Sequence, residues 1–248
     1  MMTSLPLSQL PIASIQLIAT DMDGTLTQQE QFTPAVLAAL AQSPVPIIIS
    51  TGRSAGWVSG LAHYLPVAGA IAENGGVFFS PEQPQGDFLG AIADITAHRH
   101  DLAQLFVQLQ QRWPQLEPSA DNAFRLTDWT FDITALSGSE IEYCAAYCQD
   151  LGWGFTYSTV QGHLKLLEQD KAQGLKTVLQ RHFPGVDPQV VLTIGDSPND
   201  EPMFNPEMFP LSVGVANITA YQAEMQYFPR YLTTAAEGAG FCELIEQL

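Results

Sequence analysis

The apolar residues of this chain gather in short continuous runs with amphipathic segments between them. Residues 15–20 ("IQLIAT"), 45–51 ("VPIIIST") and 189–196 ("QVVLTIGD") are apolar almost without alternation. Runs of this length that end at turn residues are typical of strands buried on both faces of a sheet. The segments 34–42 and 53–65, which follow the first two runs, have the composition of helices. Strands that alternate with helices predict an α/β fold with a parallel sheet.

The pattern changes after residue 80. Within "AGAIAENGGVFFS", Asn74 and Gly75 predict the turn of a β-hairpin, and the Pro/Gly-rich segment "PEQPQGD" then indicates a domain boundary. Beyond it we predict helices at 98–113 and 139–151, an antiparallel strand pair within 122–136, and short strands at 153–160 and 162–168 that turn at Gln161 and Gly162. These elements predict a small α+β unit.

The first pattern returns near residue 166. It predicts a helix at 171–183, strands at 189–196, 211–217 and 228–234, and a closing helix at 238–248. We therefore predict a Rossmann-like α/β core, with a parallel sheet flanked by helices, formed by residues 1–81 and 166–248. Residues 82–165 form an α+β cap domain inserted between the two parts of this core.

Charge and composition restrict the partners of the protein. The chain has 9 Lys and Arg against 26 Asp and Glu, a net charge of −17, and contains no basic run. We expect neither nucleic acid nor an anionic membrane surface as a partner, because both require a basic footprint. Three cysteines without a disulfide spacing, no long apolar span and no signal peptide predict a cytoplasmic protein. No pattern predicts an oligomeric state.

Polar side chains follow the predicted strands where those strands end. The set comprises Asp21 and Asp23 after the first strand, Ser50, Thr51 and Arg53 after the second, Asp196 and Asp200 after the third, and Lys171 at a helix start. Sites in open α/β sheets form beyond the carboxyl ends of the strands, so these groups are expected at one edge. Carboxylate oxygens with few His or Cys suit a hard cation, Mg²⁺ in particular, bound together with a substrate phosphate.

Two acids two positions apart suit two chemical roles. One carboxylate attacks phosphorus and forms an aspartyl-phosphate. A second carboxyl, protonated in a different environment, protonates the leaving alcohol and later activates water. A cation shared by both acids explains why like charges stand together at the end of a buried strand.

Four motifs in order resemble one known family. "DMDGTLT", "ISTGRS", Lys171 and "GDSPND" stand in the order typical of the haloacid dehalogenase-like superfamily of phosphatases. The sequence is most similar to the Cof-type and sucrose-phosphatase-like members, which carry a cap between the second and third motifs. The resemblance spans the core, about two thirds of the chain, whereas the cap matches only by position and pattern.

The resemblance implies roles for the core residues. Asp21 is implied to be the nucleophile, and Asp23 the general acid/base that also offers its backbone carbonyl to Mg²⁺. Thr51 is implied to donate a hydrogen bond to the transferring phosphoryl group, and Lys171 to neutralise its charge. Asp196 is implied to be the third metal ligand beside Asp21 and Asp23.

Further residues are expected around this centre. Asp200 would orient the metal ligands or Lys171, Asn199 would contact phosphate, and Arg53 would contact either the substrate or an acid. Substrate contacts from the cap are expected from Arg125, His163 and Lys165. His163 and Lys165 are two residues apart and so share one face of a strand.

The expected function is that of a Mg²⁺-dependent phosphomonoesterase. Its substrate would be a small phosphorylated metabolite, for which we expect a sugar phosphate. A phosphomutase or phosphotransferase that uses the same aspartyl-phosphate is the alternative within enzymes. A regulatory protein that binds a phosphorylated ligand without turnover is the alternative of a different class, and the presence of Asp21, Asp23 and Asp196 argues against it.

Overall fold

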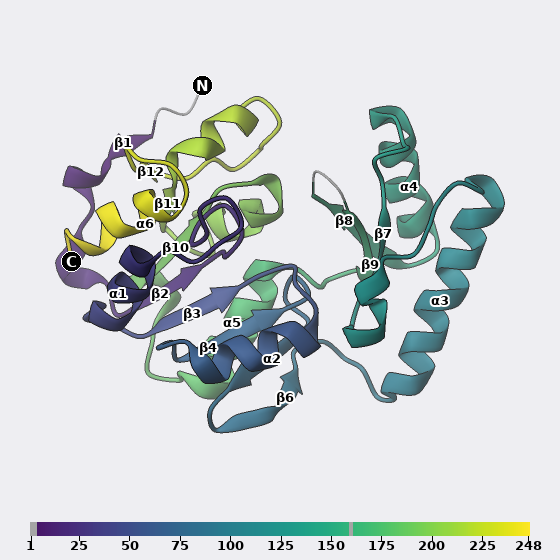
Figure 1. Ribbon diagram of the computed structural model, residues 1–248, viewed down its shortest axis with the longest axis horizontal. Coiled ribbons are helices and arrows are strands. Elements are labelled where there is room, and N and C mark those ends of the chain that lie inside the picture. Colours follow the sequence, from purple (N-terminus) through teal and green to yellow (C-terminus); the bar gives the residue numbers. More distant parts are fainter. Residues whose placement is uncertain (1–3, 159–160) are drawn as a thin grey trace.

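A computed structural model describes residues 4–158 and 161–248, which form two bodies side by side (Figure 1). The larger body contains a nine-stranded sheet in the order β1-β12-β11-β10-β2-β3-β4-β5-β6. Its strands are β1 (Leu5–Pro6), β2 (Leu17–Thr20), β3 (Ile47–Ser50), β4 (Gly69–Ala72), β5 (Val77–Ser80), β6 (Gln83–Phe88), β10 (Val191–Gly195), β11 (Leu211–Gly214) and β12 (Tyr231–Leu232). All neighbours from β1 to β4 are parallel, and β5 and β6 extend the sheet as antiparallel strands.

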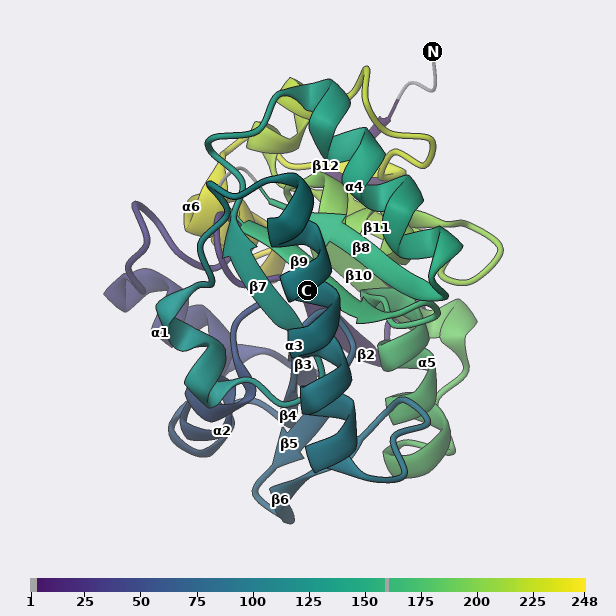
Figure 2. The same ribbon diagram turned by 90° about the vertical axis from the view of Figure 1, so that its right-hand side faces the viewer.

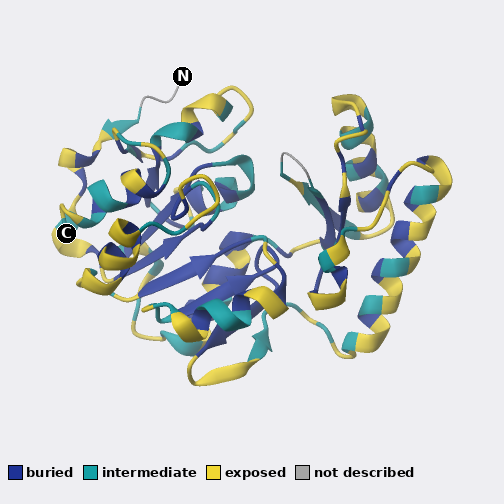
Figure 3. Cartoon of the chain, viewed as in Figure 1, coloured by how far each residue is buried: buried dark blue, intermediate teal, exposed yellow. Residues whose placement is uncertain are grey.

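Helices cover both faces of this sheet. Alternate strand residues point to opposite faces, so Ile18 packs with α1 (Pro34–Gln42), α2 (Ala55–Tyr64) and α6 (Glu237–Ile245) on one side. Leu17 packs with α5 (Lys171–His182) on the other side. The central strands β2, β3, β4, β10 and β11 are buried along their whole length (Figure 3), as expected for a parallel sheet enclosed by helices. This confirms the predicted α/β fold class.

The smaller body is an α+β unit built on one three-stranded sheet. Its elements are α3 (Ile95–Arg112), the 3₁₀ helix η3 (Ala120–Phe124), β7 (Trp129–Asp132), α4 (Gly138–Asp150), β8 (Trp153–Tyr157) and β9 (Gln161–Leu166). The antiparallel sheet has the order β7-β9-β8. Its outer face packs against α3 and α4 around the buried Phe131 and Leu164, and both helices lie on the side away from the large sheet (Figures 1 and 2).

The structure differs from the sequence-based expectations in three places. β6 pairs with β5, so the large sheet continues past residue 81, where we expected the core to end. Residues 122–136 contain one strand, β7, preceded by η3, rather than a strand pair. Gln161 and Gly162, predicted as a turn, are the first residues of β9. The end of the strand predicted at 153–160 lies outside the described residues.

The β4–β5 hairpin forms at the predicted Asn-Gly turn. Glu73, Asn74 and Gly75 have φ of +56°, +52° and +98°, a left-handed path that asparagine and glycine tolerate well and glutamate does not. A Cβ on Gly75 would lie 2.0 Å from the Asp170 carbonyl, so glycine is required for the turn to pack against the start of α5. The hairpin therefore connects the sheet edge with the segment that carries Lys171.

Candidate active site

Three acids from two segments of the chain meet beyond the carboxyl ends of two central strands. β2 and β10 are parallel neighbours, with Thr20 opposite Ile194. Asp21 follows β2, and its amide donates to the Ile194 carbonyl at 2.8 Å. Asp196 follows β10, and Asp200 comes four residues later. Carboxylate oxygens of Asp21, Asp196 and Asp200 lie within 4.8 Å of one another, and all three residues are buried.

A buried ammonium lies against two of these acids. Lys171 is the first residue of α5, and its Nζ donates to Asp21 Oδ1 at 2.5 Å and to Asp200 Oδ1 at 2.6 Å. The helix starts there because the Asp170 side chain accepts from the Gln173 amide and caps it. Burial alone lowers the pKa of Lys171, but Asp200 and Asp21 raise it above its ordinary value. The side chain is therefore a fixed positive charge.

Asp196 is held by neutral donors. Thr25 Oγ1 donates to Asp196 Oδ1 at 3.0 Å, and Asn217 Nδ2 donates to Oδ2 at 2.9 Å. A Cβ on Gly24 would lie 2.5 Å from Oδ2, and Gly24 has a φ of +82°, so only glycine fits this close approach. Burial and the neighbouring Asp200 raise the pKa of Asp196 to about 7. The sequence pattern did not single out Asn217, although it follows β11 at the same edge of the sheet.

Asp200 orients the loop that follows β10. Its Oδ2 accepts from the amides of Asp196 at 2.9 Å and Ser197 at 3.1 Å, while its Oδ1 accepts from Lys171. Asp200 therefore connects the backbone of Asp196 with the Lys171 ammonium. The predicted role of Asp200, which is to orient the metal ligands or Lys171, stays a prediction.

The acid cluster has the donor set of a hard divalent cation. Lys171 pairs with Asp21 and Asp200, and within the described ranges no Lys or Arg pairs with Asp196. Burial raises the pKa of Asp21 well above its ordinary value, with Lys171 opposing the rise. Crowded buried carboxylates of this kind are stabilised by a cation, and oxygen ligands suit Mg²⁺. The residues present thus fit the metal that the sequence predicts.

The Asp23 side chain is engaged elsewhere. Arg53 donates to it twice, from Nε to Oδ2 at 2.9 Å and from Nη2 to Oδ1 at 2.7 Å, and both side chains are partly exposed. The Arg53 guanidinium also lies 5.4 Å from the ring centroid of Trp57. Of the two contacts expected for Arg53, substrate or acid, the structure contains the acid. The proposed metal contact of Asp23 through its backbone carbonyl stays a prediction.

Two hydroxyl residues lie at the end of β3, which pairs with β2: Ser50 is its last residue and Thr51 follows it. The Oγ1 of Thr51, a buried residue, accepts from the Arg53 amide at 3.2 Å, and its carbonyl accepts from the Asn74 amide at 3.0 Å. The buried Ser50 hydroxyl has no hydrogen-bond partner within residues 4–158 and 161–248. Thr51 thus shares a loop with Arg53, and its phosphate contact stays a prediction.

Arg125 connects the cap to the core. Its guanidinium pairs with Asp121 at 2.8 Å and with Asp128 at 2.9 Å, and Nη1 also donates to the Gly52 carbonyl at 3.1 Å. Gly52 follows Thr51 directly, so Arg125 fixes the cap against a loop of the candidate site. We expected Arg125 to contact substrate. The structure shows that its donors already serve the two cap acids and the core loop.

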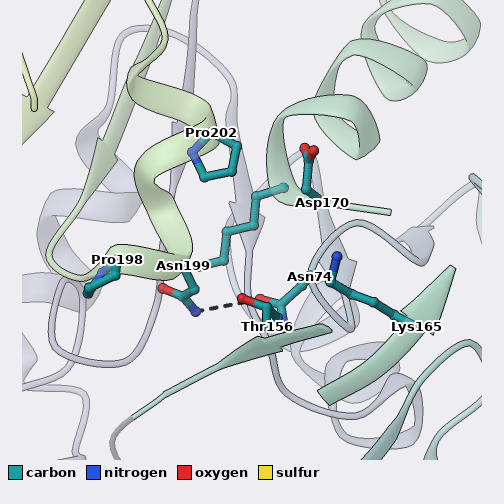
Figure 4. Close-up of a pocket in the computed structure, with 8 residues that line it drawn as sticks. Asn74, Thr156, Lys165, Asp170, Pro198, Asn199 and Pro202 are labelled. Carbon is teal, nitrogen blue, oxygen red and sulfur yellow. Dashed lines mark hydrogen bonds between the residues drawn. The ribbon is translucent and has the colours of Figure 1, made fainter. Parts of the chain in front are cut away.

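A pocket lies where the cap faces the acid cluster (Figure 4). His163 Nδ1 lies 2.8 Å from Asp128 Oδ2 and 3.5 Å from Asn74 Nδ2. Asn199 Nδ2 donates to Asn74 Oδ1 at 3.5 Å. The pocket is lined by Asn74, Thr156, Lys165, Asp170, Lys171, Pro198, Asn199 and Pro202. Two of the predicted outer residues, Asn199 and Lys165, therefore share a cavity with Lys171.

Glu73 is a functional candidate that the sequence pattern did not reveal. Its fully buried carboxylate accepts from the Ala55 amide at 2.8 Å, from the Leu126 amide at 2.9 Å and from the Thr127 amide at 2.6 Å. It thereby joins the start of α2 to the cap. Burial, together with the charge of Asp128, raises the pKa of Glu73 to about 7. For the "ENGG" segment, a hairpin turn and a contribution of its backbone to the site were equally expected from the sequence. The role of the Glu73 side chain was not, because its cap partners lie about fifty residues further along the chain.

Comparison with known proteins shows which family this chain matches. The haloacid dehalogenase-like hydrolase family matches residues 15–206. A phosphoglycolate phosphatase from Methanothrix thermoacetophila is 26 % identical over 242 residues, which cover 94 % of this chain and 97 % of that protein. A HAD/COF-like hydrolase from Plasmodium vivax has a similar fold, with a TM-score of 0.72 at 17 % identity over 94 % of this chain and 95 % of its own. The C-terminal domain of trehalose-6-phosphate phosphatase from C. albicans gives 0.70 at 15 % identity, with 100 % and 97 % covered.

This α/β fold carries an acid cluster at its strand ends, and the family model that matches it is one of hydrolases. The chain belongs to the haloacid dehalogenase-like hydrolase family. It is a phosphatase of this family, and the Cof-type assignment made from the motifs is consistent with its structural neighbours. In the described part of the chain no helix is both long and apolar enough to cross a membrane.

Proposed function

We propose that this protein is a Mg²⁺-dependent phosphomonoesterase that hydrolyses a small phosphorylated metabolite through an aspartyl-phosphate on Asp21. One observation supports this above the others: Lys171 and Asp196 lie against Asp21 in a buried cluster. A carboxylate that is buried beside a fixed ammonium, with room for a second cation, is arranged to attack an anionic phosphoryl group.

Each side chain of the centre has a part in this reaction. Asp21 attacks phosphorus, and the bond from phosphorus to the leaving oxygen breaks. Asp23 gives a proton to that oxygen and later takes one from the water that hydrolyses the aspartyl-phosphate. Lys171 and Thr51 stabilise the charge on the equatorial oxygens of the phosphoryl group. Mg²⁺, when bound by Asp21, Asp196 and the Asp23 carbonyl, supplies further positive charge at the same oxygens.

Asp23 must leave its resting partner to act as an acid. Arg53 holds it by two hydrogen bonds, so both of its oxygens are occupied by donors. We infer that substrate entry displaces Arg53 from Asp23. The partly exposed position of both side chains supports such a movement at small energetic cost.

The substrate class is a small phosphorylated metabolite, for which we keep the sugar phosphate expected from the sequence as the first candidate. Phosphoglycolate and trehalose 6-phosphate, which name two of the similar proteins, differ in whether the leaving group carries a charge. Transfer to a second acceptor, as in a phosphomutase, would use the same aspartyl-phosphate. We also propose a cytoplasmic location, which the free thiols of Cys144, Cys148 and Cys242 support.

A phosphate-release screen tests this function. The purified protein is incubated with a panel of phosphate monoesters without any acceptor alcohol, first with Mg²⁺ and then after chelation of divalent ions. We expect inorganic phosphate from at least one ester. Chelation should lower the rate by about a hundredfold or more, because the cation provides several kcal/mol of charge stabilisation, and added Mg²⁺ should restore it.

Three outcomes separate the alternatives. Release that is indifferent to chelation would refute the metal site. Phosphate transfer that appears only when a second alcohol is added would favour a phosphotransferase. Binding of a phosphorylated ligand without any turnover would favour a regulatory protein.

A further inference from the structure

Lys165 lies on the face of the cap sheet that is turned toward the core. β9 is the middle strand of that sheet. Leu164 packs into the cap core with Phe131, so its neighbours His163 and Lys165 point to the opposite face. Lys165 lines the same pocket as Lys171 (Figure 4).

The two lysines of this pocket differ in their surroundings. Lys171 has two carboxylates at 2.5 and 2.6 Å. Lys165 is almost as deeply buried, with 6 % of its surface exposed, yet its Nζ donates to a backbone carbonyl, that of Gln169. Among residues 4–158 and 161–248, no carboxylate forms an ion pair with Lys165.

The nearby acids are committed to other partners. Asp170 and Asp128 attract Lys165 only at longer range, and burial still lowers its pKa. Asp170 caps α5, and Asp128 is paired with Arg125 and His163. An ammonium has three N–H donors, of which one carbonyl satisfies one. A buried positive charge with so little compensation is costly unless an anion comes to it.

We propose that Lys165 binds a second anionic group, carried by the leaving group of the substrate, while Lys171 and the acid cluster hold the phosphoryl group. This inference rests on the proposed function. It narrows the substrate to a phosphate monoester whose leaving group bears a carboxylate or a second phosphate, so that among sugar phosphates it favours those that carry a second anionic group. The cavity of about 60 Å³ holds a few waters, which suits a short leaving group.

Three esters with one two-carbon skeleton test this assignment. 2-Phosphoglycolate carries a carboxylate, ethylene glycol bisphosphate carries a second phosphate, and 2-hydroxyethyl phosphate is neutral at that position. For the wild-type protein we expect kcat/KM for at least one anionic ester to exceed that for the neutral ester by about 30-fold or more. Which anionic ester is preferred identifies the group that Lys165 binds. The same esters are compared as inhibitors of p-nitrophenyl phosphate hydrolysis, so that an ester without turnover is still measured.

Two variants assign the preference to the residue. Lys165→Met keeps most of the length of the side chain and removes its charge. We expect kcat/KM for the preferred anionic ester to fall by about tenfold or more beyond any fall for the neutral ester, so that most of the preference is lost. Lys176→Met, an exposed change on α5, is the matched control and should behave as wild type. Thermal unfolding of each variant, without ligand and with each ester, reports on folding and on binding.

The outcomes are distinct. Equal use of all three esters by the wild type would overturn the assignment without any variant. An equal loss for all three esters in Lys165→Met would also overturn it, since Lys165 would then serve the fold or the phosphoryl group. A protein that hydrolyses no ester at all, p-nitrophenyl phosphate included, would refute the proposed function. The ester-dependent shifts in unfolding temperature would in that case still decide whether Lys165 binds the second anion.

Discussion

Replacement of Asp21 by asparagine should abolish phosphate release. Asp21→Asn keeps the shape of the side chain and an oxygen that accepts from Lys171 Nζ, now 2.5 Å from Asp21 Oδ1. A neutral amide is a poor nucleophile toward phosphorus, so no aspartyl-phosphate forms. We expect kcat to fall by about 10⁴-fold or more, a loss typical of removing a nucleophile. Steady-state release of inorganic phosphate at saturating substrate measures the effect.

The fold should survive this change, which separates chemistry from stability. Asparagine matches the shape of aspartate and keeps one oxygen that accepts from Lys171, and Lys171 retains its ion pair with Asp200 at 2.6 Å. Asp150→Asn, an exposed change at the end of α4, is the control and should leave both activity and unfolding temperature unchanged. Turnover of Asp21→Asn near the parent rate would reject the nucleophilic role.

Removal of the Lys171 charge should damage both catalysis and stability. In Lys171→Met, the buried Asp21 and Asp200 lose the ammonium that pairs with them at 2.5 and 2.6 Å. We expect kcat/KM to fall by about 10³-fold, because the charge of the transferring phosphoryl group is no longer neutralised. Without divalent ions we expect a loss of about 3–5 kcal/mol in the free energy of unfolding, as for other buried pairs with one partner removed.

The stability loss of Lys171→Met should depend on Mg²⁺ and on pH. Bound Mg²⁺ should restore part of it, since ligand binding to the native state stabilises that state. Burial and Asp200 hold the pKa of Asp196 at about 7, above its ordinary 3.8. Such a carboxyl destabilises the metal-free fold increasingly as pH rises from about 4 to about 7. Lys171 lowers the pKa of both Asp21 and Asp196, so its removal makes their ionisation in the folded state more costly still. Chemical unfolding at pH 5 and pH 8 should therefore show the larger difference between Lys171→Met and the wild type at pH 8.

The matched control for this variant lies in the same helix. Lys176 is exposed, so Lys176→Met should change neither kcat/KM nor the free energy of unfolding by much. If Lys171→Met unfolded with the same free energy as Lys176→Met at pH 8 without divalent ions, the ion pairs of the cluster would not be holding the site together.

The sequence predicted the centre of the site because strand ends are readable from apolar runs. Asp21 and Asp196 each follow such a run, and parallel strands bring their carboxyl ends to one edge. Asn217 follows the same rule after β11, but its residue type is not a common metal ligand, so it carried no signal. The sequence predicted Lys171 only as the start of a helix. Its contacts with two carboxylates became visible only in the folded structure.

The pattern of apolar and polar residues along the sequence could not predict which residues of the cap contact the core. Glu73 has its amide partners at Leu126 and Thr127, in a segment whose position depends on how the two bodies pack. The segment "PEQPQGD", which contains most of β6, predicts a boundary because it is polar and rich in turn residues. An edge strand with exposed residues accepts such a composition more readily than a central strand does. Residues 122–136 alternate in polarity, but η3 takes up their first part.

Trapping of the phosphorylated residue tests the central claim most directly. The protein is mixed with its substrate and Mg²⁺, quenched in acid within the first turnover, and reduced with borohydride, which converts an aspartyl-phosphate to homoserine. Peptide mass spectrometry then reports which carboxyl was phosphorylated. The account predicts homoserine at position 21, dependent on substrate and absent from Asp21→Asn. Steady phosphate release with an unmodified Asp21, or homoserine at another position, would contradict it.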